Sequence, residues 1–421
     1  MVSGWTQTTL GDVIELKRGY DLPQRERIPG SVPLVSSSGV TDYHSEAKVK
    51  GPGVVTGRYG TLGQVFFVAE DFWPLNTTLY VRDFKGNDPR FVGYFLTSLD
   101  YLAYSDKAAV PGLNRNHVHQ APVLFPSDVY EQRAIAHILG TLDDKIELNR
   151  RMNDTMEEMA RALFKSWFVD FDPVRANVEG RDSGVPKPLA DLFPARLVDS
   201  ELGEIPEGWE VRPLSDCVDV ARGLSYKGAG LSEGGVPMHN LNSIYEGGGY
   251  KHDGLKHYDY DGDYKSQHVV RAGDLIVANT EQGHHRLLIG YAAIVPARFG
   301  QESLFSHHIY RVRPERESEL TADYLCHLLN TSVMHDIVSG YANGTTVNML
   351  PIDGLQSPLI VVPPARAISA FTGIAKATRL RHEEMVDESR TLAALRDGLL
   401  PKLISGELRV EDEESFVGSG A

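Results

Sequence analysis

Two long segments of the chain carry apolar residues at alternating spacings of three and four. Such spacing is typical of the buried seam of a long helix in a coiled coil. In residues 131–168 the seam positions are Ile135, Leu139, Leu142, Ile146, Asn149, Met152, Met156, Met159 and Leu163. In residues 365–400 they are Ile368, Phe371, Ile374, Thr378, Met385, Leu392, Leu395 and Leu399. Pro401 is expected to end the second helix.

Each predicted helix is roughly 55 Å long and must bury its seam against a partner. The nearest partner of equal length is the other helix, which predicts an antiparallel coiled coil in which Asn149 fixes the register. The alternative, two separate helices packed on their own domains, is disfavoured because each helix is too long for such a domain to cover. Gly140 and Gly373 are weak points, costing roughly 1 kcal/mol each relative to Ala.

The segments that precede the long helices predict mixed α/β domains. Short apolar runs bounded by Gly, Pro and Asp indicate strands. In the first half of the chain they lie at 13–19, 53–60, 63–70 and 77–83, and in the second half at 217–223, 274–280, 289–295 and 308–314. Helical spacing predicts a helix at 89–104 and another at 321–340.

The chain also repeats itself. GWTQTTLGDVIELKRGY (4–20) matches GWEVRPLSDCVDVARGL (208–224) at an offset of 204, and QAPVLFP (120–126) parallels QSPLIVVP (356–363). If the helices are antiparallel, the two copies sit at opposite ends of a pseudo-two-fold molecule. The predicted fold is therefore α+β: two mixed α/β recognition domains separated by two long helices. The expected boundaries are a first domain at 1–130, a helix at 131–171, a linker at 172–203, a second domain at 204–364, a helix and end at 365–410, and a disordered acidic tail at 411–421.

Composition constrains the function classes. The chain has 421 residues and a formal net charge of -15, which counts against DNA binding by the chain alone. Residues 1–130 hold 12 Lys+Arg and 13 Asp+Glu, whereas residues 203–363 hold 12 and 20. Cys217 and Cys326 form no CxxC pair, which fits a reducing compartment. The absence of a signal peptide at the start and of a long apolar run predicts a cytoplasmic protein without membrane contact.

Catalytic and cofactor motifs are missing from the sequence. It contains no GxxxxGK[ST], no HExxH and no EF-hand loop. The Gly-rich GRYGTLG (57–63) lacks dinucleotide spacing and is interpreted as a strand–turn–strand corner. The pairs His284–His285 and His307–His308 have no suitable third ligand, so solvent-facing or DNA-facing histidines are favoured over a metal site. We expect no catalytic residue, cofactor or metal in this chain.

Three long stretches resemble a known family: LFKSWFVDFDPVRAN (163–177), LGEIPEGWEVRPLSD (202–216) and LLPKLISGELRV (399–410). They are similar to signature stretches of the specificity subunits of type I restriction–modification systems. The resemblance implies two target-recognition domains, each reading one half of a bipartite, asymmetric DNA target. It implies that the helices set the spacing and dock two modification (methyltransferase) subunits, which would bind S-adenosylmethionine. A restriction (motor–nuclease) subunit would complete the complex, and its partners could supply the missing positive charge.

Residues that could contact double-stranded DNA are polar side chains on loops between the predicted elements. In the first copy the candidates are Lys17, Arg18, Ser36, Ser37, Ser38, Arg58, Tyr59, Thr61, Asn114, Arg115 and Asn116. In the second copy they are Arg222, Tyr226, Lys227, Asn279, Thr280, Gln282, His284, His285, Arg286, Asn343, Thr345, Thr346 and Asn348. Arg18 and Arg222 recur in both copies, which favours a structural or phosphate-contacting role over base reading. Trp5 and Trp209 also recur, and packing is favoured over base stacking.

Two other function classes stay open at this point. The acidic balance would suit a protein-only scaffold whose two domains bind protein ligands. A stand-alone enzyme would need a cofactor site that the sequence does not show.

Overall fold

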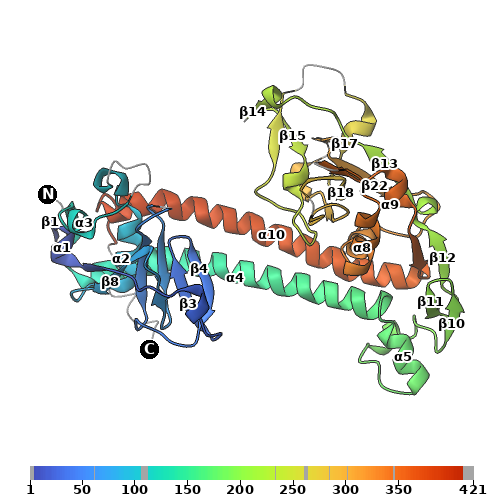
Figure 1. Ribbon diagram of the computed structural model, residues 1–421, viewed down its shortest axis with the longest axis horizontal. Coiled ribbons are helices and arrows are strands. Elements are labelled where there is room, and N and C mark those ends of the chain that lie inside the picture. Colours follow the sequence, from blue (N-terminus) through green and yellow to red (C-terminus); the bar gives the residue numbers. More distant parts are fainter. Residues whose placement is uncertain are drawn as a thin grey trace. The chain divides into compact units, whose positions relative to one another are not determined.

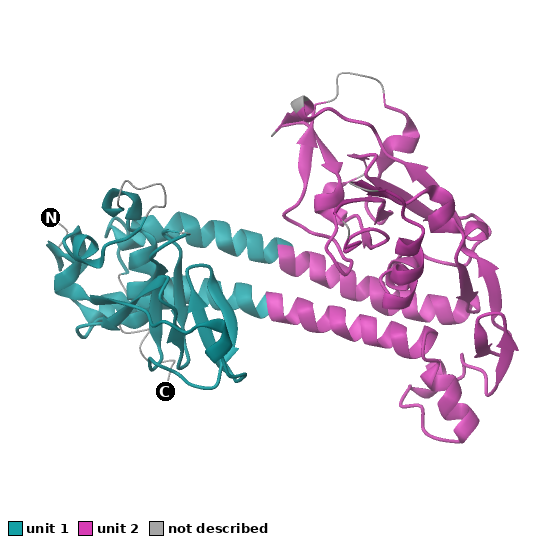
Figure 2. Cartoon of the chain, in the orientation of Figure 1, with its two compact units in different colours: residues 1–149, 387–421 teal, residues 150–386 magenta. Residues whose placement is uncertain are grey.

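The computed structural model describes residues 4–60, 62–105, 112–232, 234–259, 264–283, 285–300, 302–344 and 347–410. The chain divides into two compact units, which Figure 2 distinguishes by colour. Unit 1 comprises residues 1–149 and 387–421, and unit 2 comprises residues 150–386. The division falls inside both long helices, α4 (Val129–Phe168) and α10 (Ala365–Ile404). No helix in the described ranges is long and apolar enough to cross a membrane.

Unit 1 is a mixed α/β domain followed by a long helix (Figure 1). Its strands are β1 (Trp5–Thr9), β2 (Glu15–Arg18), β3 (Val32–Ser36), β4 (Gly39–His44), β5 (Gly53–Gly57), β6 (Val65–Val68), β7 (Trp73–Pro74), β8 (Thr78–Asp83) and β9 (Pro122–Pro126). Its short helices are α1 (Leu10–Val13), α2 (Pro89–Thr97) and α3 (Arg115–His119). The strands form sheets in the orders β2-β8-β5-β6, β4-β3-β7 and β1-β9.

The core of unit 1 lies between the sheet and the helices. Phe91 and Leu96 of α2 pack with Ile135 and Leu139 of α4, and the buried Leu403 at the end of α10 joins the same cluster. The Asp88 side chain caps α2 by accepting a hydrogen bond from the backbone N–H of Phe91. The domain is therefore fixed to the start of the long helix that follows it.

Unit 2 contains the same kinds of element with additions. Its strands are β10 (Leu197–Ser200), β11 (Gly203–Pro206), β12 (Glu210–Pro213), β13 (Val218–Arg222), β14 (Leu231–Ser232), β15 (Val236–His239), β16 (Lys256–Tyr258), β17 (Val269–Val270), β18 (Leu275–Ala278), β19 (Thr280–Gln282), β20 (Ala292–Ile294), β21 (Ser303–Phe305), β22 (Ile309–Pro314), β23 (Val347–Met349) and β24 (Leu359–Val362). Its helices besides the long ones are α5 (Asp172–Glu179), α6 (Lys187–Ala190), α7 (Ala322–Leu329), α8 (Ser332–Gly340) and α9 (Ile352–Gln356).

The strand pairings of unit 1 recur in unit 2. The sheet β13-β22-β18-β20 has the connectivity of β2-β8-β5-β6, and β12-β24 corresponds to β1-β9. In a further sheet, β15 pairs with β16 antiparallel and with β21 parallel, as β3 does with β4 and β7. In the core of unit 2, Tyr324 of α7 packs with Phe371 of α10 and with Phe164 and Phe168 of α4.

The second long helix departs from the expectation in one respect. Pro401 lies inside α10, which continues to Ile404, so the prediction that this proline ends the helix is wrong. Proline removes one helical hydrogen bond, but the last turn buries Leu403 and Ile404 in the core of unit 1. Burial of these two side chains offsets the lost hydrogen bond.

Three shorter segments differ from their sequence patterns. The predicted helix at 89–104 is α2 plus a 3-10 turn at Tyr101–Tyr104, and the helix predicted at 321–340 is divided into α7 and α8. The break follows from Thr331, whose hydroxyl caps the second helix. Residues 172–203, expected to be a linker, contain α5, α6 and β10, and Val174 and Phe193 of this segment are buried in the unit 2 core.

Candidate nucleic-acid interface

In unit 1 the candidate DNA-contacting segments meet at one end of the sheet β2-β8-β5-β6. Strand register places Arg18 opposite Leu79, and Gly57 opposite Thr78. The carboxyl ends of β2 and β5 therefore flank the amino end of β8. The loops that follow β2 and β5 consequently leave the sheet side by side.

Residues 74–78 form the centre of this edge. The backbone N–H of Tyr20 donates to the carbonyl of Pro74 at 2.8 Å, and that of Arg58 donates to Thr77 at 2.8 Å. Gly19 lies so close to this segment that a Cβ there would sit 2.2 Å from the carbonyl oxygen of Leu75. Only glycine allows that approach, which explains the glycine after the first strand.

The cationic side chains of this edge are partly free. Arg18 is exposed and forms an ion pair with Asp21 at 3.7 Å. Lys17 is half-buried and points its Nζ toward the hydroxyl of Tyr20, 3.5 Å away. The guanidinium of Arg58 lies 4.6 Å from the ring centre of Tyr59, a residue that is 41% exposed. Arg58 is half-buried, and a guanidinium stacked on an exposed ring suits contact with a base or a phosphate.

Two further loops reach the same edge. Ser36, Ser37 and Ser38 form the β3–β4 turn, in which the hydroxyls of Ser36 and Ser38 are 2.9 Å apart. A Cβ on Gly60 would lie 3.4 Å from the hydroxyl oxygen of Ser37, so this turn packs beside the β5–β6 corner.

The 114–116 segment joins the corner through the residue that precedes it. The backbone N–H of Leu113 donates to the carbonyl of Arg58 at 3.0 Å. Asn114 caps α3 by accepting from the N–H of Asn116 at 3.0 Å, and Arg115 and Asn116 are exposed. Thr61 lies outside the described residues.

Unit 2 builds the same edge from equivalent backbone positions. Arg222 lies opposite Tyr310 and Ala278 opposite Ile309 in the sheet. The N–H of Leu224 donates to Phe305 at 2.8 Å, and that of Asn279 donates to His308 at 3.1 Å. A Cβ on Gly223 would lie 2.3 Å from the carbonyl oxygen of Ser306, as at Gly19 in unit 1.

The first loop of this edge combines cations and aromatic rings. Arg222 and Lys227 are exposed, and the backbone N–H of Lys227 donates to the Tyr258 hydroxyl at 3.1 Å. The ring of Tyr226 lies between those of Tyr258 and His307, with ring-centre distances of 5.5 and 6.3 Å.

Three of the unit 2 candidates are buried and hold the edge together. Asn279 donates to the carbonyl of His307 at 3.1 Å, and the Thr280 hydroxyl lies 2.9 Å from Nδ1 of His308. Asn348 donates to the carbonyl of Gly283 at 2.5 Å. These side chains therefore fix loop conformation in the structure.

The remaining unit 2 candidates are more accessible. Gln282, His285 and Asn343 are exposed. Arg286 is half-buried, has a φ of 52° and donates to the carbonyl of Ala342 at 3.4 Å. His284, Thr345 and Thr346 lie outside the described residues.

The sequence analysis did not include the polar pair at the centre of each edge among the DNA-contact candidates, although it favoured a solvent-facing or DNA-facing position for His307–His308. In unit 1 this pair is Asn76–Thr77, and in unit 2 His307–His308 occupies the corresponding position. Asn76 donates to the carboxylate of Asp21, and the buried Thr77 hydroxyl has no hydrogen-bond partner among the described residues. The sequence feature that could have indicated these residues is a polar pair between two apolar runs, in PLNTTLY (74–80) and LFSHHIY (304–310).

The two central histidines are close enough to influence each other. Their ring centres are 3.9 Å apart. Burial lowers the pKa of His308, and the neighbouring His307 and Arg222 lower it further. A neutral imidazole offers one donor and one acceptor, which is suited to reading a base edge.

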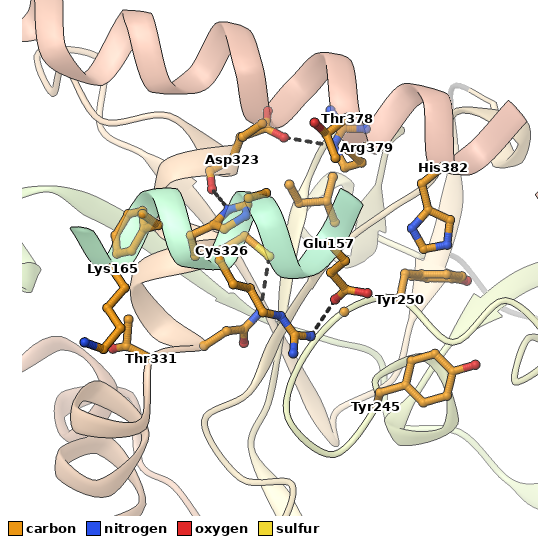
Figure 3. A pocket seen from close by; sticks show the side chains of 18 of the residues that line it. Glu157, Lys165, Tyr245, Tyr250, Asp323, Cys326, Thr331, Thr378, Arg379 and His382 are labelled. Atoms are coloured by element: carbon orange, nitrogen blue, oxygen red, sulfur yellow. Dashed lines mark hydrogen bonds and ion pairs between the residues drawn. The ribbon is translucent and has the colours of Figure 1, made fainter. Parts of the chain in front are cut away.

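A separate cavity of about 300 Å³ lies within unit 2, away from this edge (Figure 3). It is bounded by α4, α7 and α10 and by the loop that carries Tyr245 and Tyr250. Its charged groups form ion pairs, including Arg161 with Glu157 at 2.5 Å. Among the described residues, no group of three or more His, Cys, Asp or Glu is arranged to hold a metal ion.

Comparison with known proteins points to one class of protein. Residues 2–158 match the family described as the type I restriction modification DNA specificity domain. It is 25% identical over 322 residues to the type I restriction enzyme MjaIX specificity subunit of Methanocaldococcus jannaschii, covering 75% of this chain and 67% of that protein. It is also 25% identical over 405 residues to the HindI specificity subunit of Haemophilus influenzae, covering 82% and 84%.

A solved structure shares the fold. The S subunit of a type I restriction-modification system from M. genitalium superposes with a TM-score of 0.61 at 14% identity, covering 95% of this chain and 96% of that one. The chain is therefore similar in sequence to type I restriction enzyme specificity subunits over most of its length, and residues 2–158 match the specificity-domain family.

Proposed function

We propose that this chain is the sequence-specificity subunit of a type I restriction–modification complex, in which each recognition domain reads one half of a bipartite, asymmetric DNA target. One observation carries the proposal: the same backbone edge occurs in both units with different side chains. Arg58 and the pair Asn76–Thr77 in unit 1 correspond to Asn279 and His307–His308 in unit 2. Equal frames with unequal side chains suit two related readers of unequal sequences.

We propose that α4 and α10 form one antiparallel coiled coil that sets the spacing of the half-sites. Contacts inside unit 1 support this direction, since Asp143 pairs with Arg396 at 2.6 Å whereas Asn149, further along α4, donates to the earlier Glu388 at 2.8 Å. Inside unit 2, Phe164 of α4 packs on Phe371 near the start of α10. A pseudo-two-fold relation between the recognition domains follows from this arrangement.

The outer side of α4 suits docking of the modification subunits. Leu148, Met152 and Met159 are 50%, 39% and 65% exposed and lie at helical spacings. Met152 and Met159 were expected in the buried seam, so that part of the seam prediction is wrong. Exposed methionine and leucine on one helix mark a surface for a partner. Two methyltransferase subunits bound there would carry S-adenosylmethionine and perform the chemistry, and a motor–nuclease subunit would complete the complex in the cytoplasm. This chain supplies no catalytic group.

Exchange of one recognition domain tests whether each domain reads one half of the target sequence. Residues 5–126 are replaced by the first recognition domain of another type I specificity subunit, and methylated sites are read by methylation-sensitive sequencing of cellular DNA. We expect one half of the recognised sequence to change while the other half and the spacer remain. A matched replacement of residues 209–363 should change the other half. Exchanges that alter both halves, or neither, contradict the proposal.

The net charge of -15 favours one competing function, a protein-only scaffold. Retention of the chain on duplex DNA, measured with and without its methyltransferase across a range of salt concentrations, separates the two. A DNA reader releases counterions and loses affinity steeply as salt rises. Absence of retention in both preparations, or retention that ignores salt, favours the scaffold.

A further inference from the structure

In unit 1 the recognition domain is attached to its long helix through a cation on the domain and anions on the helix. Arg90 is the second residue of α2, and its Nη1 and Nη2 donate to the two carboxylate oxygens of Asp144 on α4, at 3.0 and 2.5 Å. Nη2 also donates to the carbonyl of Gly140 at 3.1 Å. The neighbouring Asp143 accepts from the hydroxyl of Tyr94, again on α2, at 2.5 Å.

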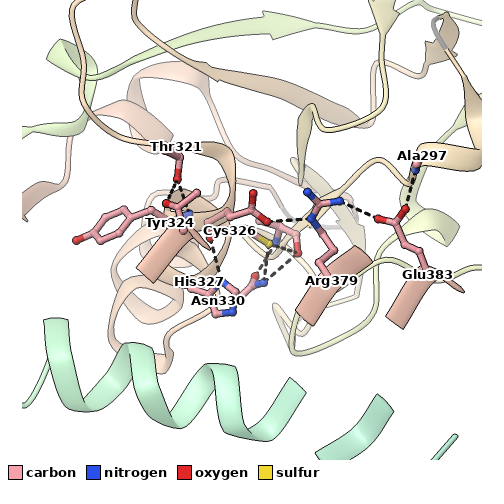
Figure 4. A network of polar contacts seen from close by, with 11 residues as sticks. Ala297, Thr321, Tyr324, Cys326, His327, Asn330, Arg379 and Glu383 are labelled. Atoms are coloured by element: carbon pink, nitrogen blue, oxygen red, sulfur yellow. Dashed lines mark hydrogen bonds and ion pairs between the residues drawn. The ribbon is translucent and has the colours of Figure 1, made fainter. Parts of the chain in front are cut away.

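In unit 2 the corresponding attachment has the opposite polarity. Asp323 is the second residue of α7 and accepts from Nε of Arg379 on α10 at 2.9 Å. Figure 4 shows Arg379 also reaching Glu383, whose carboxylate accepts the backbone N–H of Ala297 at 2.8 Å. Here the domain supplies the anion and the helix supplies the cation.

The two attachments occupy equivalent places in the fold. Asp88 caps α2 and Thr321 caps α7, and each cap accepts from the third residue of its helix. Helix α2 packs on β5 and β6, and α7 packs on their counterparts β18 and β20. Asp144 and Arg379 each lie about four turns from the start of their long helix.

Gly140 belongs to the unit 1 attachment. A Cβ at this position would lie 2.6 Å from Cζ of Arg90 and 2.7 Å from its Nε. The glycine weakens the helix by roughly 1 kcal/mol, but it allows the guanidinium to lie flat against α4. Its place in the helix is explained by the ion pair beside it.

We propose that this reversed polarity makes each recognition domain specific for its own long helix and disfavours packing of either domain on the other helix. A first domain placed on α10 would bring Arg90 against Arg379. A second domain placed on α4 would bring Asp323 against Asp143 and Asp144. Like charges held together in a partly buried contact disfavour the wrong pairing, while each correct pairing satisfies its charges.

A double-mutant cycle in the full chain tests the charge complementarity. The variants are Asp323→Arg, Arg379→Asp and the two combined, and the readout is hydrogen exchange of α7 peptides without DNA, with α2 peptides as internal reference. Each single variant should raise α7 exchange about tenfold or more, because it leaves like charges in a buried contact, and the pair should recover most of the protection. Single variants that leave α7 exchange unchanged, or a combined variant as unprotected as the single ones, would contradict the proposed charge complementarity.

Exchange of the domain order tests the pairing rule itself. A chain with residues 209–363 in the first place and 5–126 in the second is compared with the same chain carrying Asp144→Arg and Arg379→Asp. The uncorrected chain should show the faster exchange in both α2 and α7, and the corrected chain should regain protection. Equal protection in the two chains, whether high or low, overturns the proposal. Because no DNA is present, this result is independent of whether the domains read the proposed half-sites.

Discussion

The recognition edges of the two units share a backbone frame and differ in the side chains placed on it. In both units a glycine after the first strand lies against the carbonyl of a central segment, at Gly19 and Gly223. The first residue after β5 in unit 1 is a half-buried cation, Arg58, whereas the first residue after its counterpart β18 in unit 2 is a buried amide, Asn279. The hydrogen bonds that define the edge are made by backbone atoms. Side chains can therefore change, and with them the DNA sequence read, without loss of the frame.

The same comparison separates parts that support the edge from parts that can read DNA. In unit 2, Asn279 and Asn348 donate hydrogen bonds to loop carbonyls, whereas the exposed groups include Arg222, Lys227 and Gln282. In unit 1 the segment between β5 and β6, residues 58–64, is shorter than the segment between β18 and β20 in unit 2, residues 279–291. In the longer second domain, more of the polar side chains therefore form hydrogen bonds within the domain's own loops.

The largest expected effect comes from breaking the shared frame. Gly19→Ala and Gly223→Ala would each place a Cβ within 2.2 or 2.3 Å of a backbone oxygen, so we expect each to destabilise its own unit by about 3 kcal/mol. Hydrogen exchange by peptide should show loss of protection in β2 and β8 for the first variant and in β13 and β22 for the second. Gly228→Ala is the matched control, because nothing lies within 4 Å of a Cβ there. Equal loss in both units from one variant would contradict separate frames.

A second prediction concerns what differs between the frames. Arg58→Ala should weaken DNA binding by the complex by roughly 1–3 kcal/mol and relax the sequence preference of one half-site only. Asn279→Ala should instead loosen its loop, because it removes the hydrogen bond to the carbonyl of His307. Fluorescence anisotropy on duplexes with single-base changes measures the first effect, and loop hydrogen exchange the second. Arg25→Ala, at an exposed 3-10 turn, serves as the control. Unchanged affinity and unchanged preference would remove Arg58 from the interface.

These contrasts show which features could be predicted from the sequence. The strands and long helices follow from local periodicity. Arg18 and Arg58 were selected as candidates because one ends a strand and the other follows a strand, each beside a glycine. Asn76 was not selected because its place depends on a hydrogen bond to a segment distant in sequence, the one to Asp21. His307 was expected to face solvent or DNA, but its position at the centre of the edge could not be predicted from the sequence.

Other features depended on burial, which a local pattern does not report. Asn348 was chosen as a polar loop residue, yet it is 4% exposed and bonded to Gly283. Pro401 was expected to end α10, but burial of Leu403 carries the helix past it. In both cases a tertiary contact decides what the local sequence leaves open.

A third prediction concerns pH: the stability of unit 2 should be more sensitive to acid than that of unit 1. Burial, with a further contribution from Arg298, lowers the pKa of His239 to about 3. Because this folded-state pKa lies below the ordinary value near 6.5, the unfolded chain binds the extra proton first, and stability falls as pH drops below about 6.5. The loss from His239 amounts to about 1.4 kcal/mol at pH 5.5. Burial also lowers the pKa of His308, His327 and His382 in the same unit.

Hydrogen exchange at pH 7.5 and 5.5, corrected for intrinsic rates, measures this acid effect. Peptides from β15 and β18 should lose protection before those from β5 and β8. His239→Gln removes the titrating group and should flatten the pH dependence of unit 2, whatever its effect at neutral pH. Equal acid sensitivity of the two units, or an unchanged slope in that variant, would count against the assignment.

The smallest expected effect tests what the two edges have in common. Arg18 and Arg222 occupy equivalent strand ends and are exposed. Within the described ranges, Arg18 forms one ion pair, with Asp21 at 3.7 Å. A residue that serves both domains alike should contact the phosphate backbone, which is the same in both half-sites. Each Arg→Ala variant should therefore reduce the slope of log affinity against log salt by about one, with little change in affinity at high salt and none in base preference. Salt titrations of the complex on matched and single-base-changed duplexes would measure both quantities. A changed base preference in either variant would show instead that the arginine of that unit contacts a base.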